Sequence, residues 1–90
     1  MFTSWGRETV RAYTKNELAA ILSALGDEEK YGIVLRSKGI VREKDGGWLH
    51  FDYVPGEPDV RSGSASVIGK ICVIGASLNE DAVAELFGVN

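Results

Sequence analysis

The chain has a single cysteine, a single histidine and two prolines among its 90 residues. One cysteine excludes an internal disulfide, and we expect a reducing, cytoplasmic setting. No apolar run approaches the ~18 residues that a membrane-spanning helix needs, so we expect no membrane partner. A length of 90 residues predicts one domain, residues 1–90, with a modest core.

The sequence also lacks an excess of basic residues. Ten Lys and Arg stand against 13 Asp and Glu, and the formal net charge is −3. Nucleic-acid-binding domains generally carry a strong basic field, because neutralising phosphates provides most of their affinity. We therefore expect no nucleic-acid partner. The remaining composition, 44% hydrophobic and 26% charged, is typical of a globular protein.

Two helices are predicted from capping residues and apolar spacing. Thr14 and Glu17 have the spacing of a capping box, and Gly26 offers the left-handed conformation that ends a helix. A second helix is predicted to begin near Asn79 and to end at Gly88. The predicted buried positions are Leu18, Ile21, Leu22 and Leu25 in the first helix and Val83, Leu86 and Phe87 in the second.

The rest of the chain predicts strands. Residues 2–13 are mixed, with Trp5, Val10 and Ala12 as candidate inward positions. The other strands are predicted at residues 32–42, at 48–54, weakly at 60–68, and at 70–75 as a short apolar central strand. The order β-α-β-β-(β)-β-α predicts an α+β open-faced sandwich, a mostly antiparallel sheet of four or five strands with two helices on one face.

The segment VLRSKGIV, residues 34–41, sets charged side chains in a strand that otherwise looks buried. Strict alternation places Val34, Arg36 and Lys38 on one face and Ile33, Leu35 and Ser37 on the other. Gly39 then indicates a bulge that would return Ile40 or Val41 to the core side. On the helix-free face, Arg36 and Lys38 either cover the sheet, with their stems over Trp48 or its neighbours, or serve in recognition. The second interpretation predicts a docking surface for a protein partner or an anionic ligand, made of Arg36, Lys38, Trp48 and His50.

No residue pattern predicts a catalytic, cofactor or metal site in this chain. The segment GSASVIGK, residues 63–70, fails as a phosphate loop because its glycines are too far apart and it precedes a strand. His50 lacks the companions that a metal ion needs. Cys72 has apolar neighbours, so we expect a buried small hydrophobe. We therefore expect that the domain is not an enzyme.

Three segments together resemble the C-terminal domain of CobW-type P-loop GTPases, which are related to the HypB and UreG metallochaperones. The segments are VLRSKGIV at 34–41, GGWLHFDYVPG at 46–56 and GKICVIGASLNEDAVAELFG at 69–88. The family has a strand with Leu-Arg-x-Lys-Gly, an aromatic strand ending near Pro-Gly, and an apolar strand ending Ile-Gly before a helix with Leu-Phe near its end. The opening FTSW, residues 2–5, also resembles the family's start, so the resemblance spans nearly the whole chain.

The resemblance implies a non-catalytic accessory or protein-interaction domain. In the family, GTP hydrolysis and a Cys-rich metal site belong to a preceding domain, so GTP, Mg and a transition metal are expected there and not in this chain. The implied partners are the GTPase domain of the parent protein and a metal-receiving target protein. The implied setting is metal insertion, metal trafficking or cobalamin synthesis, and no catalytic residue carries over.

Two other functions remain open. An RNA-binding sheet is one alternative, since RNA-recognition folds share the β-α-β-β-α-β order and stack bases on strand aromatics such as Trp48. The aromatic–glycine signature of those folds is absent from the third strand. The other alternative is a small enzyme that uses Cys72 and His50, which would require an exposed and activated thiol.

Overall fold

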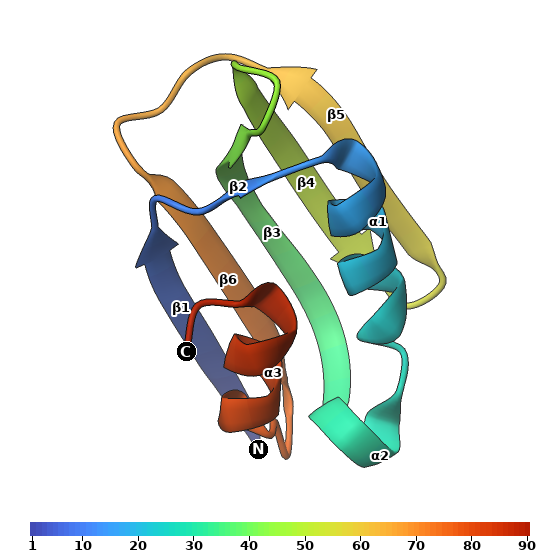
Figure 1. Ribbon diagram of the computed structural model, residues 1–90. Helices are drawn as coiled ribbons and strands as arrows, with labels where there is room; N and C mark the ends of the chain where they lie inside the picture. The colour runs from blue at the N-terminus through green and yellow to red at the C-terminus, as the bar shows by residue number, and fades with distance from the viewer.

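The computed structural model describes residues 1–90 as a single sheet with helices on one side (Figure 1). The elements are β1 (Phe2–Thr9), β2 (Ala12–Tyr13), α1 (Lys15–Ala24), α2 (Glu28–Tyr31), β3 (Ile33–Glu43), β4 (Trp48–Val54), β5 (Glu57–Gly63), β6 (Gly69–Ala76) and α3 (Glu80–Phe87). The main strands follow the order β1-β6-β3-β4-β5 in antiparallel pairs, and the short β2 runs parallel to β3. The predicted α+β open-faced sandwich is confirmed, with six strands and three helices. No helix combines the length and apolar character needed to cross a bilayer.

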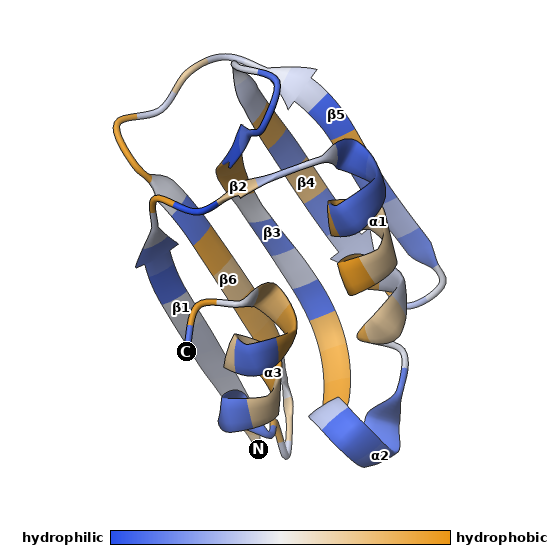
Figure 2. Ribbon diagram, in the orientation of Figure 1, coloured by the Kyte–Doolittle hydropathy of each residue, from blue (hydrophilic) through white to orange (hydrophobic).

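The core lies between the sheet and its helices, with α1 over the β4–β5 side and α3 over the β1–β6 side (Figure 1). The rings of Trp5 and Phe51 lie 6.1 and 6.2 Å from the ring of Phe87. Tyr13 is fully buried and donates its hydroxyl to the carbonyl oxygen of Phe87 at 2.6 Å. Burial raises the pKa of Tyr13, against the opposing charge of Arg11. Figure 2 shows apolar segments in α1 and α3, and the core residues of these helices include Leu18, Leu22, Val83 and Phe87.

Three of the predicted helix ends are confirmed. Thr14 and Glu17 form the capping box, because the Thr14 hydroxyl accepts from the Glu17 amide at 3.0 Å and the Glu17 carboxylate accepts from the Thr14 amide at 2.8 Å. The side chain of Asn79 accepts from the amide of Ala82 at 3.2 Å and begins α3. Gly88 ends α3 with a φ of 71°, in the left-handed region that glycine tolerates best.

The prediction that Gly26 ends the first helix in a left-handed conformation is wrong. The C-cap of α1 is Leu25 in right-handed helical geometry, and Gly26 is absent from the residues with positive φ. The chain turns instead into α2, where the side chain of Asp27 accepts a hydrogen bond from the Lys30 amide. Gly32 ends this short helix with a φ of 86°. Four residues are too few to show helical periodicity, so the sequence did not predict α2.

The strand predictions need two further corrections. Val10, a candidate inward residue, is 75% exposed, because it lies between β1 and β2 in the connection that crosses the end of the sheet. The fifth strand begins at Glu57 and not at residue 60, since Pro55-Gly56 forms a two-residue hairpin turn with Gly56 at a φ of 80°. Pro58 is tolerated in β5 because this strand is at the edge of the sheet.

The bulge of β3 lies at Leu35 and not at Gly39. The register against β6 shifts between Val34 and Arg36, whereas Gly39 pairs regularly with Ile71 and Phe51. Val34 therefore packs in the core, while Leu35 is 39% exposed. Ile33, also predicted inward, is 44% exposed, and Val41 reaches the core by simple alternation. The placement of Arg36 and Lys38 on the helix-free face is confirmed.

Gly39 leaves room for a close approach of neighbouring strands. A Cβ at this position would collide with the carbonyl oxygen of Lys70 and would lie 2.7 Å from the ring of Phe51. We expect Gly39→Ala to lower the free energy of unfolding by about 1–3 kcal/mol in denaturant titrations. Gly6→Ala is the matched control, because its Cβ would meet only the Ile71 carbonyl oxygen at 3.8 Å. Equal stability of the two variants would contradict this packing argument.

The hydrogen bonds of Glu17 make the free energy of unfolding depend on pH in the acid range. A hydrogen bond from Lys44, followed by the Thr14 backbone amide, lowers the pKa of Glu17 from 4.5 to about 2. Because the folded-state value is the lower one, this stabilisation is complete above pH 4.5 and is lost as the pH falls toward 2. Glu17→Gln retains the cap but does not titrate. We expect its free energy of unfolding to fall less than that of the wild type over this range; parallel curves would contradict the assignment.

Candidate functional site

The helix-free side of the sheet, called here the open face, carries the candidate functional residues. Helix-facing and solvent-facing side chains alternate along every main strand, apart from the Leu35 bulge. The central part of the open face presents Glu8 from β1, Lys70 and Cys72 from β6, Arg36, Lys38, Ile40 and Arg42 from β3, Trp48, His50 and Asp52 from β4, and Asp59 and Arg61 from β5. The structure thus brings the four sequence-predicted residues of β3 and β4 onto one surface.

Arg36, one of these predicted residues, is held by an acidic neighbour on β4. Its guanidinium lies 3.0 Å from one carboxylate oxygen of Asp52, and the guanidinium of Arg61 lies 3.4 Å from the other. Arg61 also pairs with Asp59 at 2.6 Å. The hydrogen bond from Arg36 is the main reason that the pKa of Asp52 is lowered. The charges of this β3–β4–β5 network are satisfied within the chain.

Trp48 and His50 are also engaged within the chain. The guanidinium of Arg42 lies 4.8 Å from the ring centroid of Trp48, so Arg42, and not Arg36 or Lys38, covers this ring. Nε2 of His50 lies 2.8 Å from the carbonyl oxygen of Ser64. His50 therefore ties the segment after β5 to the edge of the open face.

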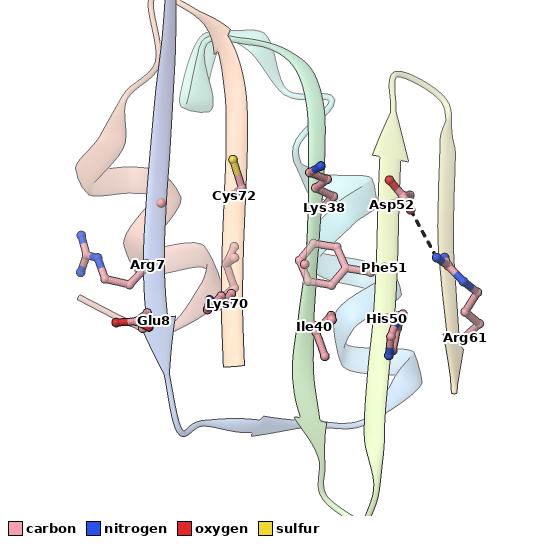
Figure 3. Close-up of a pocket in the computed structure, with 13 residues that line it drawn as sticks. Arg7, Glu8, Lys38, Ile40, His50, Phe51, Asp52, Arg61, Lys70 and Cys72 are labelled. Carbon is pink, nitrogen blue, oxygen red and sulfur yellow. Dashed lines mark hydrogen bonds and ion pairs between the residues drawn. The ribbon is translucent and has the colours of Figure 1, made fainter. Parts of the chain in front are cut away.

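A hollow of about 840 Å³ lies in the open face, and Figure 3 shows it with the helices behind the sheet. Gly6 and Cys72 are small, so they leave a depression between strands that carry longer side chains. The expectation that Cys72 is buried is wrong: it is half-buried and lines the hollow, with Sγ 3.8 Å from the Ser4 hydroxyl. Its neighbours Ile71 and Val73 point to the core, and Cys72 between them faces the opposite side of the sheet.

Two lysines border the hollow without an ionic partner. The side chains of Lys38 and Lys70 form no hydrogen bond or ion pair, although Glu8 lies opposite Lys70 in the register of β1 and β6 and Asp52, which is paired with Arg36 and Arg61, lies opposite Lys38 in the register of β3 and β4. Lys38 was predicted on this surface, but Lys70 was not. Lys70 belongs to a strand whose other residues are all apolar or small, and this masked its outward position in the sequence.

The open face does not assemble the catalytic pair considered from the sequence. Cys72 lies on β6 and His50 on β4, with β3 between them. Two strand spacings put their backbones roughly 10 Å apart, and no hydrogen bond joins the side chains. No group of three or more His, Cys, Asp or Glu side chains is close enough to hold a metal ion. The segment 63–70 leads into β6 and provides no helix N-terminus for a phosphate.

The family model described as the cobalamin synthesis protein CobW C-terminal domain matches residues 2–89. The chain belongs to this family. The resemblance stated from the three sequence segments is therefore confirmed for this CobW C-terminal domain.

Two solved structures share the fold of this CobW C-terminal domain. Zn(II)-bound YjiA GTPase from E. coli is 21% identical, with a TM-score of 0.75 over 99% of this chain and 30% of that chain. A Zn(II)-bound triple mutant of YjiA GTPase is 18% identical, with a TM-score of 0.78 over 97% of this chain and 29% of that one. The chain thus spans about 30% of the length of YjiA. No curated protein matches the sequence.

The cover of Trp48 by Arg42 can be measured by fluorescence. We expect Arg42→Ala to shift tryptophan emission to longer wavelength and to increase acrylamide quenching, because the half-buried Trp48 ring loses its cover. The free energy of unfolding should change by less than about 1 kcal/mol. Arg7→Ala is the matched control: Arg7 lies 5.2 Å from the ring centroid of Trp5, which stays buried against Phe87. An unchanged spectrum in Arg42→Ala would contradict the contact.

Proposed function

We propose that this CobW C-terminal domain is a non-catalytic accessory domain of a CobW-type GTPase and that it recognises proteins through its open face. Membership of the family is the observation that carries this proposal. The partners are the GTPase domain of the parent protein and a metal-receiving target protein, in metal insertion, metal trafficking or cobalamin synthesis. GTP, Mg and a transition metal would be held by the GTPase domain. The zinc-bound state of the YjiA structures supports a setting in metal handling.

The composition of the open face supports protein recognition. At one end, Phe2 pairs with Ala76 across β1 and β6, and Ala76 pairs with Ile33 across β6 and β3. Phe2 is 70% exposed and Ile33 is 44% exposed, so this row offers an accessible apolar strip. Beyond this strip, the open face carries the ion-pair network around Asp52 and the unpaired side chains of Lys38 and Lys70. Apolar area bordered by polar groups is the usual composition of a protein interface.

RNA binding receives less support from the same surface. The rings of Phe51 and Tyr53, on the strand expected to supply stacking aromatics, are buried on the helix side. Trp48, the remaining aromatic residue of β4, is covered by the guanidinium of Arg42. Base stacking needs exposed ring faces, and β4 offers none that is free.

The proposal is tested with a separately expressed CobW-type GTPase domain from the same organism, loaded with GDP or with a non-hydrolysable GTP analogue. We expect calorimetry to show saturable binding with different affinities for the two nucleotide states, and bound GTPase domain to slow the modification of Cys72 by a maleimide. The combined change Arg36→Ala and Lys38→Ala should weaken binding about tenfold while changing the free energy of unfolding by less than about 1 kcal/mol.

Lys15→Ala is the control for this experiment, since Lys15 is exposed at the start of α1, on the helix side of the sheet. This variant should bind like the wild type. Absence of binding in both nucleotide states would overturn the accessory role with this partner. Binding that is unaffected by the Arg36 and Lys38 changes would show that the open face is not the docking surface.

A further inference from the structure

The cationic side chains of the open face fall into two groups. The three arginines are engaged: Arg36 and Arg61 share the carboxylate of Asp52, and Arg42 covers Trp48. The two lysines are free of any ionic partner. An arginine in a satisfied network must lose its partners before it can bind another anion, whereas a free lysine loses only water. The free lysines are therefore the side chains of this surface that are available to an external anion.

Lys38 and Lys70 are diagonal neighbours on adjacent strands. Lys38 pairs with Cys72, two residues beyond Lys70 on β6, and Lys70 pairs with Ile40, two residues beyond Lys38 on β3. Diagonal neighbours on one face of an antiparallel pair lie roughly 7–8 Å apart. Both lysines line the hollow, which also exposes Cys72 opposite Lys38 and Ile40 opposite Lys70 (Figure 3). Two positive charges are thus presented side by side over a shallow apolar floor.

We propose that Lys38 and Lys70 bind two carboxylates of an extended acidic segment on a partner protein, spaced as Glu-x-Glu or Asp-x-Asp. Residues i and i+2 of an extended chain project from the same side and lie roughly 6.6–6.8 Å apart, which matches the diagonal spacing of the lysines. Each lysine ammonium group then pairs with one carboxylate, and the apolar parts of the acidic side chains occupy the hollow. This inference rests on the proposed function for its biological setting and specifies the chemistry of the partner.

The surroundings of the lysines favour a protein segment over a small anion or a nucleic acid. The hollow is open to solvent, and single ion pairs at such sites contribute only about 0–1 kcal/mol, so a free anion would gain little. Glu8 and Asp52 border the hollow and would repel a continuous polyphosphate backbone. A segment with only two carboxylates carries fewer negative charges past these acids than a polyphosphate does, and it adds backbone and apolar contacts. Charge complementarity at two points therefore selects an acidic peptide.

The experiment uses the isotopically labelled chain and four probes in NMR titrations at low salt. The probes are a capped Thr-Glu-Val-Glu-Thr peptide, the same peptide with Gln in place of Glu, inorganic phosphate and a short oligothymidylate. We expect the Glu peptide to shift the backbone amides of Lys38, Lys70 and Cys72 saturably and the Gln peptide to bind more weakly. The combined Lys38→Ala and Lys70→Ala changes should lower the affinity for the Glu peptide about fivefold or more.

Two further variants separate the proposed site from general electrostatic attraction. Combined Lys15→Ala and Lys30→Ala changes alter the net charge equally but lie on α1 and α2, so this control should bind within about twofold of the wild type. Gly6→Leu fills the floor of the hollow without changing charge and should weaken binding.

The inference would be overturned if the Lys38/Lys70 and Lys15/Lys30 double variants lost the same affinity for the Glu peptide. Tighter binding of phosphate or oligothymidylate than of the Glu peptide would also overturn it. Equal binding of the Glu and Gln peptides would also overturn it. The titration requires no GTPase domain, so its failure is separate from failure of the proposed function. If the GTPase domain bound this chain while the Glu peptide did not, the accessory role would stand and the acidic-segment assignment would fall.

Discussion

The two-residue period of the central strands decides which side chains of this domain are structural and which are available to a partner. On β4 and β6, one side chain of each neighbouring pair packs beneath the helices and the other faces solvent. Phe51 and Val73, for example, belong to the core, whereas His50 and Cys72 lie on the open face. Since the helices cover only one side, the opposite side retains the charged residues and the hollow. A shift of the strand register by one residue would exchange these two roles.

The features predicted correctly from the sequence depend on residues that are close along the chain. Thr14 and Glu17 satisfy each other's backbone amides within one turn, and Asn79 does the same at α3, so capping residues and spacing were sufficient. The alternation of β4 was visible because its outward residues Trp48, His50 and Asp52 are more polar than its inward ones. The fold class followed from the order of such local elements.

The errors within the sheet interior concern features that depend on pairing between distant strands. The bulge at Leu35 exists because β3 shifts its register against β6, and nothing within residues 33–41 specifies that partner. Gly39 was interpreted as the bulge, but its small size serves the approach of the Phe51 ring and the Lys70 carbonyl. On β6, Cys72 is an outward residue of apolar character, so the alternation that exposes Lys70 was hidden in the sequence. Such positions require the three-dimensional pairing.

The structure distinguishes the residues of the candidate surface that already have partners within the chain from those that do not. From sequence, Arg36 and His50 were as plausible as Lys38, because unpaired and paired side chains look alike along a chain. In the fold, Arg36 completes the Asp52 network and His50 holds the segment at Ser64, so both have structural partners that a ligand would have to replace. Lys38 has none, and Lys70 joins it from the neighbouring strand. These two lysines, one from each central strand, are therefore the cationic side chains of the open face that an external anion could bind without displacing an ionic partner.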